Sequence, residues 1–147
     1  MRGTIQDITQ RQEQQLALEV AQGRLQSMYE TTPAMLHSID AQGRLLHVSN
    51  AWLACLGYRR DEVIGRPSSY FMTEESRMRA VKDVLPRFFA TGRCDEVPYQ
   101  MVTSSGDIVD VLLSAILERD SAGQPVRSLA VVQDVTLRRR AERELAR

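Results

Sequence analysis

The chain has 147 residues, of which 43% are hydrophobic, and its 19 basic and 19 acidic side chains give no net charge. This length and composition fit one folded domain and exclude a disordered chain, and the balanced charge provides no general attraction to nucleic acid or an anionic membrane. No apolar run approaches the roughly 18 residues of a membrane span. The two isolated cysteines, Cys55 and Cys94, exclude a cysteine-based zinc site and favour a reducing, cytoplasmic location.

The first predicted element is a linker helix over residues 10–31. It contains no proline and is rich in glutamine, glutamate, alanine and leucine, which favour helices. Four apolar residues follow the three–four spacing of a short coiled coil: Leu18, Ala21, Leu25 and Met28. A lone helix with so narrow an apolar stripe is marginal in water. We therefore expect a partner surface, which is either the chain's own domain or the same helix of a second subunit in a homodimer.

The helices in the middle of the chain are predicted from their end residues. Asn50 is a candidate N-cap for a helix over residues 51–56. Thr73 is a candidate N-cap for a longer helix that runs to about residue 91. Pro86 lies inside this longer helix and is expected to kink or split it, because proline removes a backbone donor and clashes with the preceding turn.

Five strands are predicted, two before these helices and three after them. The first pair, residues 34–39 and 44–48, flanks an Asp–Gly turn. The later three are segments in which apolar and polar residues alternate: residues 97–103, 109–117 and 126–135. Strands segregated in this way predict an α+β fold: a five-stranded antiparallel sheet with helices on one face, flanked by N- and C-terminal helical arms.

A short motif occurs twice, at residues 6–9 (Gln-Asp-Ile-Thr) and at residues 133–136 (Gln-Asp-Val-Thr). Both copies precede a polar helix, and the second also closes a strand. Because their separation is close to the length of one domain, residues 1–9 are predicted to be the tail of a preceding, similar domain in a tandem array. The alternative is that aspartate and threonine are common at helix starts in general.

Several landmarks also occur in a fixed order along the chain. Asp40-x-x-Gly43 is followed, at residues 50–66, by Asn-Ala-Trp-Leu-x-x-Leu-Gly-Tyr-x-x-Asp-Glu-Val-Ile-Gly-Arg. Ser-Gly-Asp at residues 105–107 and Asp-Val-Thr at residues 134–136 complete the series. This order resembles the PAS family over about residues 28–136.

The resemblance implies a PAS domain at residues 32–136, with the start of a C-terminal linker helix at residues 137–147. Such domains are sensory modules of bacterial multidomain signalling proteins, such as sensor histidine kinases of two-component systems or diguanylate cyclases. The resemblance also implies helical arms that pair in dimers, and an output domain that follows the C-terminal helix.

Members of that family bind flavin, haem, small acids or nothing in a cavity beneath the helices. Ser68 stands where the flavin-adduct subclass carries its cysteine, so a cysteinyl-flavin photoreceptor is excluded, and residues 73–91 lack the histidine of haem-binding members. A small-molecule ligand stays open, with no covalently bound cofactor and no metal expected. The candidate cavity-lining residues are Met35, His37, Trp52, Met72, Met78 and Met101. The alternative is that the methionines and Trp52 fill the core, and that His37 lies on a polar sheet face.

Asp134 and Thr136 lie where the last strand becomes the outgoing helix. Their side chains can hydrogen-bond the first free backbone N–H groups and so couple the sheet to that helix. The sequence therefore predicts a relay module that passes a ligand- or partner-dependent change to an output domain. The alternatives are a ligand-free dimerisation or spacer domain and a flavin- or haem-based redox sensor. No enzyme activity is expected, because there is no catalytic triad, phosphate-binding glycine loop or paired carboxylates in context.

Overall fold

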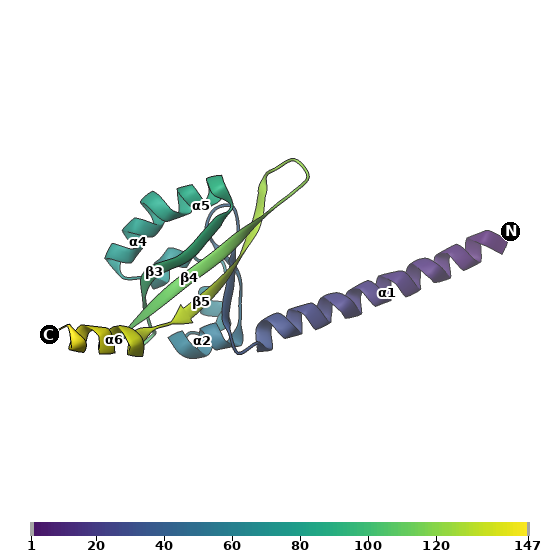
Figure 1. The fold of residues 1–147 in the computed structure, drawn as a ribbon. Coiled ribbons are helices and arrows are strands. Elements are labelled where there is room, and N and C mark those ends of the chain that lie inside the picture. The colour runs from purple at the N-terminus through teal and green to yellow at the C-terminus, as the bar shows by residue number, and fades with distance from the viewer. Residues whose placement is uncertain (1, 147) are drawn as a thin grey trace.

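The computed structural model describes the backbone of residues 2–146 and the side chains of residues 7–146 (Figure 1). A long N-terminal helix leads into a domain in which the middle helices separate two groups of strands. In chain order the elements are α1 (Arg2–Thr31), β1 (Met35–Ile39), β2 (Leu45–Val48), α2 (Asn50–Leu56), α3 (Arg60–Val63), η1 (Ser68–Phe71), α4 (Glu74–Arg79), η2 (Ala80–Val84), α5 (Leu85–Thr91), β3 (Arg93–Val102), β4 (Ile108–Arg119), β5 (Pro125–Asp134) and α6 (Thr136–Leu145).

The five strands form one sheet in the order β2-β1-β5-β4-β3, and all neighbouring strands are antiparallel. Along β4 the buried residues alternate with more exposed ones, so that Val109, Val111, Leu113 and Ala115 face the core. The core lies between this inner face and the helices between β2 and β3. The predicted α+β fold, with an antiparallel sheet and two helical arms, is confirmed.

Aspartate and glycine together make the tight turns between strands. Between β1 and β2 the Asp40 carboxylate accepts the amides of Gln42 and Arg44 at 2.8 and 3.0 Å. Gly43 has φ +81°, a conformation that residues with a Cβ resist. Asp120 makes the same pair of contacts in the turn between β4 and β5. These side-chain bonds fix the turns that set the strand register.

Strand β3 begins at Arg93, four residues before its predicted start. A bulge causes the difference: Cys94 pairs with Ala115 and Val97 pairs with Leu113, so β3 carries one extra residue between these two pairs. The bulge interrupts the alternation of apolar and polar residues, which is the pattern from which the strand is predicted.

Helix α2 is capped one residue earlier than predicted. The Ser49 hydroxyl accepts the amide of Trp52 at 3.3 Å, and it also donates to the carbonyl of Ala34 at 2.9 Å. Ser49 therefore ties α2 to the start of β1. Asn50 is instead the first helical residue, and its Oδ1 accepts a hydrogen bond from Arg60 at 2.6 Å.

The long helix predicted from Thr73 is divided into three segments, as Pro86 leads us to expect. Thr73 caps α4 by accepting the amide of Ser76. The wider π-helical turn η2 follows, and Pro86 lies in the first turn of α5. Lys82, four residues before the proline, lies in η2, where the wider turn relieves the clash with the proline ring.

Helix α1 begins at Arg2 rather than near residue 10, since no proline interrupts residues 2–31. It extends away from the sheet as a single rod (Figure 1), and the side chains of residues 7–28 are exposed. Tyr29 and Glu30 are the first half-buried residues. The assignment of residues 1–9 to a preceding domain stays a prediction; residues 2–9 are helical, and residue 1 lies outside the described residues.

Candidate functional site

A small cavity lies between the inner face of the sheet and the helical segments η1 to α5. Its volume is about 30 Å³. One water molecule needs roughly 10–15 Å³ by this measure, so the cavity accommodates about two or three non-hydrogen atoms. Pockets for drug-sized ligands have about 300 Å³ or more, so flavin and haem do not fit this arrangement of side chains.

The six candidate lining residues divide into those that line the cavity, those that are buried near it, and Met78. His37 and Met72 line the cavity. Met35, Trp52 and Met101 are buried in the surrounding core but do not line it.

Met78 lies elsewhere, because its side chain is 48% exposed. Ser76 and Ala80 are buried and lie four residues apart on one side of the helical segment, so Met78, midway between them in sequence, points to the other side. Methionine composition alone does not reveal which side faces the core, and the cavity expectation does not hold for Met78.

His37 is buried, with 4% exposure, and its Nδ1 has no hydrogen-bond partner among the described residues. Its ring meets the Trp52 ring edge to face, with centroids 6.4 Å apart. Burial lowers the pKa of His37 to about 4, so the imidazole is neutral at pH 7. This location decides against the alternative of a polar sheet face for His37.

The second histidine does not share this site. His47 pairs with Ser38, the residue after His37 in β1, and neighbouring residues of a strand point to opposite faces. His47 is exposed, and its ring contacts the Tyr29 ring at a centroid distance of 6.1 Å. Among the described residues, no group of three or more His, Cys, Asp or Glu side chains could hold a metal ion.

The other polar residues of the cavity wall were missed by the sequence reasoning. They are Ser68, Cys94, Tyr99 and Ser128, which come from η1, β3 and β5. Burial raises the pKa of the Tyr99 phenol and of the Cys94 thiol, so both are neutral at pH 7. The alternation along β3 and β5 could have identified Tyr99 and Ser128, since both lie on its buried side, whereas Cys94 precedes the bulge that interrupts it.

The junction between β5 and α6 brings the two predicted relay residues together. Asp134 Oδ1 accepts the Thr136 amide at 2.9 Å and the Thr136 hydroxyl at 2.7 Å. The Thr136 hydroxyl oxygen in turn accepts the backbone amide of Asp110 in β4 at 3.0 Å. Asp134 therefore contacts the first N–H of α6, as expected, whereas Thr136 bonds to the sheet.

Asp110 is the anchor of this junction, and the sequence reasoning missed it. Its carbonyl accepts the amide of Val135 at 2.8 Å, and its carboxylate lies 3.3 Å from the Arg143 guanidinium in α6. Its carboxylate also accepts a hydrogen bond from Gln100 in β3 at 3.2 Å. These contacts join β3, β4 and α6, but their partners are distant in sequence and leave no local pattern.

Cys55 in α2 also reaches the junction. Its thiol donates to Asp134 Oδ2 at 3.7 Å. Burial, together with the nearby Asp134 carboxylate, raises the pKa of the Cys55 thiol. The thiolate that a nucleophile requires is therefore disfavoured, and the geometry gives Cys55 a structural contact.

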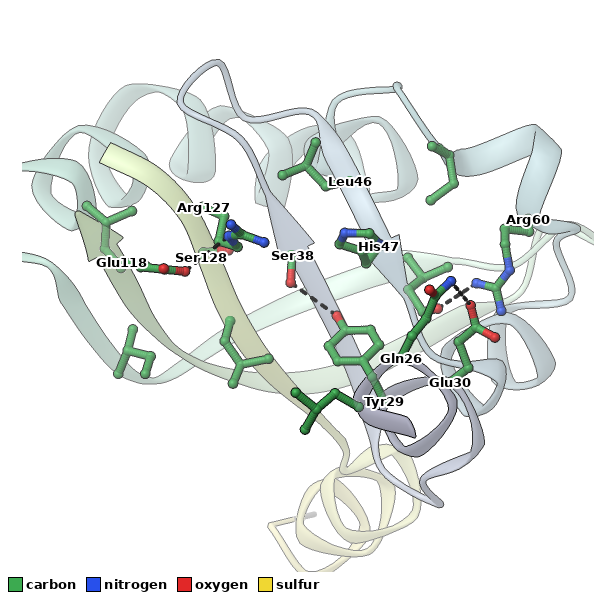
Figure 2. A pocket seen from close by; sticks show the side chains of 16 residues that line it. Gln26, Tyr29, Glu30, Ser38, Leu46, His47, Arg60, Glu118, Arg127 and Ser128 are labelled. Carbon is green, nitrogen blue, oxygen red and sulfur yellow. Dashed lines mark hydrogen bonds and ion pairs between the residues drawn. The ribbon is translucent and has the colours of Figure 1, made fainter. Parts of the chain in front are cut away.

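The outer face of the sheet carries a groove that the sequence did not predict. Its volume is about 900 Å³, and it lies between the last turns of α1 and strands β1, β2, β4 and β5. Figure 2 shows Tyr29 pointing from α1 toward Ser38, with a distance of 3.2 Å between their hydroxyl oxygens. Apolar side chains are exposed on this face: Leu46, Ile116, Leu129 and Val131.

The apolar stripe of α1 is not covered by the rest of the chain. Leu18, Leu25 and Met28 are 53%, 66% and 67% exposed, and Ala21 is exposed as well. The chain's own domain, one of the two partner surfaces considered for this stripe, leaves most of it exposed. In the described part of the chain, no helix combines the length and apolarity needed to cross a bilayer.

Comparisons with known proteins agree with this architecture. A family model for the PAS domain matches residues 32–137. No curated protein matches the chain in sequence. The PAS domain of an HTR-like protein from Haloarcula marismortui is 25% identical, with a TM-score of 0.70 over 84% of this chain and 98% of that one.

Two further structures are less similar in sequence and show the fold alone. A PAS domain from Colwellia psychrerythraea has a TM-score of 0.70 at 16% identity, over 80% of this chain and 98% of that one. An RNA-binding light-oxygen-voltage receptor has a TM-score of 0.72 at 18% identity, over 84% of this chain and 36% of that one. The family match covers most of the chain, and the sheet order and helices agree with it; the chain belongs to the PAS domain family.

Proposed function

We propose that this PAS domain is a sensory relay module, which passes a ligand- or partner-dependent change in the sheet to α6 and from there to an output domain. The observation that carries the proposal is the contact network around Asp110. It connects β4 to the first turn of α6 through Thr136 and to the next turns through Arg143. A shift of β4 therefore changes the contacts that position α6.

The proposal includes a homodimer that pairs through α1. The stripe of Leu18, Ala21, Leu25 and Met28 has coiled-coil spacing and is exposed. An isolated helix of this kind is marginal in water, so a second copy of the stripe would stabilise it. Parallel pairing would bring two α6 helices into a defined spacing, which an output domain such as that of a sensor histidine kinase could detect. A cytoplasmic location fits such a protein.

The dimer is tested by replacing Leu25 with glutamate. We expect the unmodified chain to be dimeric in light scattering, and Leu25→Glu to weaken the dimer by about tenfold or more, because a charge would be buried between the helices. Ser27→Glu is the matched control, since it adds the same charge on the opposite side of α1 and should leave the dimer intact. A chain that is monomeric at high concentration would contradict helix pairing.

The relay contact is tested at Asp134. Replacing this residue with alanine removes the acceptor of the Thr136 amide and hydroxyl, and such a hydrogen bond contributes about 1 kcal/mol to stability. We expect the Cα chemical shifts of α6 to move toward coil values while those of β1 and β2 stay unchanged. Asp134→Asn keeps an acceptor oxygen and should have a smaller effect. Equal helicity in α6 of Asp134→Ala and the unmodified chain would show that the contact does not position the helix.

The small size of the cavity favours a ligand-free dimerisation or spacer domain as the second candidate function. Native mass spectrometry of the freshly purified protein distinguishes the two candidates. Additional mass that dissociates on unfolding supports the sensor, whereas a mass equal to that of the chain alone supports the spacer. A flavin- or haem-based redox sensor has no support from a cavity of about 30 Å³.

A further inference from the structure

A polar surface cavity lies beside α6, away from the cavity in the core. Its volume is about 180 Å³, and most of its lining consists of polar side chains from α4, β3, β4 and α6. Since one water molecule needs roughly 10–15 Å³ by this measure, the space accommodates about a dozen non-hydrogen atoms. It is therefore large enough for a small organic ion, which the core cavity of about 30 Å³ is not.

The side of α6 that faces the sheet carries three polar residues, spaced three and four positions apart: Thr136, Arg139 and Arg143. The Thr136 hydroxyl and the Arg143 guanidinium both bond to Asp110. Arg139, between them in sequence, is half-buried and lines the cavity, and its guanidinium has no hydrogen-bond or ion-pair partner among the described residues. A guanidinium that loses water without gaining a partner is unfavourable. An anion in the cavity would supply that partner.

A second guanidinium without a carboxylate partner reaches the same cavity from α4. Arg79 donates to the Pro98 carbonyl, and its Cζ lies 5.3 Å from the centre of the Tyr99 ring. Both contacts are with uncharged groups, so they orient the guanidinium without neutralising it. A guanidinium has five N–H donors, and the Pro98 carbonyl leaves several of them available to a ligand.

The charges that line the cavity favour an anion. Asp110 is already paired, because its carboxylate lies 3.3 Å from the guanidinium of Arg143, which is outside the lining. The remaining charged groups are the guanidiniums of Arg79 and Arg139 and the carboxylate of the exposed Glu75. Two positive charges and one negative charge leave the lining positive, so an anion is attracted to it.

We propose that this cavity binds a phosphate group, either free or on a small organic molecule, between Arg79 of α4 and Arg139 of α6. A carboxylate presents two oxygens in one plane, which a single guanidinium can occupy. A phosphate group has oxygens on several sides and close to two negative charges at pH 7, so it can bond to guanidiniums from two elements at once. The inference rests on the proposed relay function and specifies its regulation, because a phosphate bonded to Arg139 holds the first turns of α6 against the sheet.

The ligand class is tested by NMR titration of the full chain at pH 7 with inorganic phosphate, glycerol 3-phosphate and acetate. The side-chain amide of Gln100, which lines the cavity, is followed. We expect saturable shifts with both phosphates and binding of acetate that is about tenfold or more weaker, because acetate can satisfy only one guanidinium. Tighter binding of glycerol 3-phosphate supports a phosphate ester as the source, and equal binding supports the free anion. Acetate that binds as tightly as phosphate, or the lack of a saturable response to either phosphate, overturns the proposed site.

Neighbouring arginines of α6 supply a matched pair of variants. Arg139→Gln removes one of the two guanidiniums, and we expect it to weaken phosphate binding by about tenfold or more. Arg140→Gln removes the same charge from an exposed residue outside the lining and should leave binding nearly unchanged. Glu75→Gln should tighten binding, since it removes the negative charge that opposes the phosphate. Equal binding by Arg139→Gln and Arg140→Gln would show that the anion does not contact α6.

The regulatory consequence has its own measurement. Saturation with phosphate is expected to move the Cα chemical shifts of α6 toward helical values, because Arg139 gains an anchor in its first turns. Phosphate binding that leaves these shifts unchanged would contradict a role in positioning the helix. The α1 dimer and the Asp134 contact are measured without phosphate, so the relay function can stand when this inference fails.

Discussion

Replacing Trp52 with alanine is expected to lower the free energy of unfolding by about 3–5 kcal/mol, the range for removing a large buried aromatic side chain. Trp52 is fully buried in the middle of α2. Its ring meets Phe71 edge to face at a centroid distance of 5.6 Å and His37 at 6.4 Å. The substitution therefore opens a void where α2 packs against η1 and β1.

Trp52→Phe provides a graded comparison. The indole Nε1 has no hydrogen-bond partner among the described residues, so phenylalanine removes an unpaired donor and leaves a smaller void. We expect it to cost less than alanine, and the exposed Met78→Ala to stay within about 0.5 kcal/mol of the unmodified chain. Chemical unfolding in urea measures all three. A Trp52→Ala loss no larger than that of Met78→Ala would refute the central role of α2 in the core.

Helix α2 also contacts both parts of the candidate site. Trp52 packs against His37, which lines the cavity, and Cys55, one turn later, donates to Asp134 at the start of α6. One seven-residue helix therefore contacts both the cavity wall and the junction between β5 and α6. In the proposed relay, a change in the cavity that moves Trp52 would reach Asp134 through α2 as well as through the sheet.

The features predictable from the sequence are those with local causes. Asp40 and Gly43 make the first turn by their own side-chain chemistry and backbone freedom, and Pro86 divides the long helix because of its ring. The alternation of apolar and polar residues along β4 directly indicates which of its faces is buried. In each case the residues that determine the structure lie within a few positions of its effect, so composition and spacing were sufficient.

The features that escaped prediction depend on contacts between distant segments. Ser49 replaces Asn50 as the cap of α2 because its hydroxyl also bonds to Ala34, which precedes β1. Asp110 anchors α6 from β4, with partners 26 and 33 residues later in the chain. The volume of the cavity depends on how side chains from several elements pack together, and residue types alone do not determine that.

The free energy of unfolding is expected to depend on pH through the protonation of His37. Its pKa is about 4 in the folded chain and about 6.5 when exposed, so the unfolded state binds the proton first as the pH falls. Protonation of His37 therefore does not reduce the free energy of unfolding above pH 6.5. Between pH 6.5 and pH 4 it reduces that free energy progressively. Because one pKa unit corresponds to about 1.4 kcal/mol, the full loss through this residue is about 3 kcal/mol.

His37→Phe isolates this contribution from the carboxylates that titrate in the same range. The free energy of unfolding is measured at pH 7 and pH 4 for the unmodified chain, His37→Phe and His47→Phe. We expect the loss between these two pH values to be smaller by about 3 kcal/mol in His37→Phe and unchanged in His47→Phe, because only His37 is enclosed by the core. An equal loss in all three proteins would mean that water reaches the His37 ring.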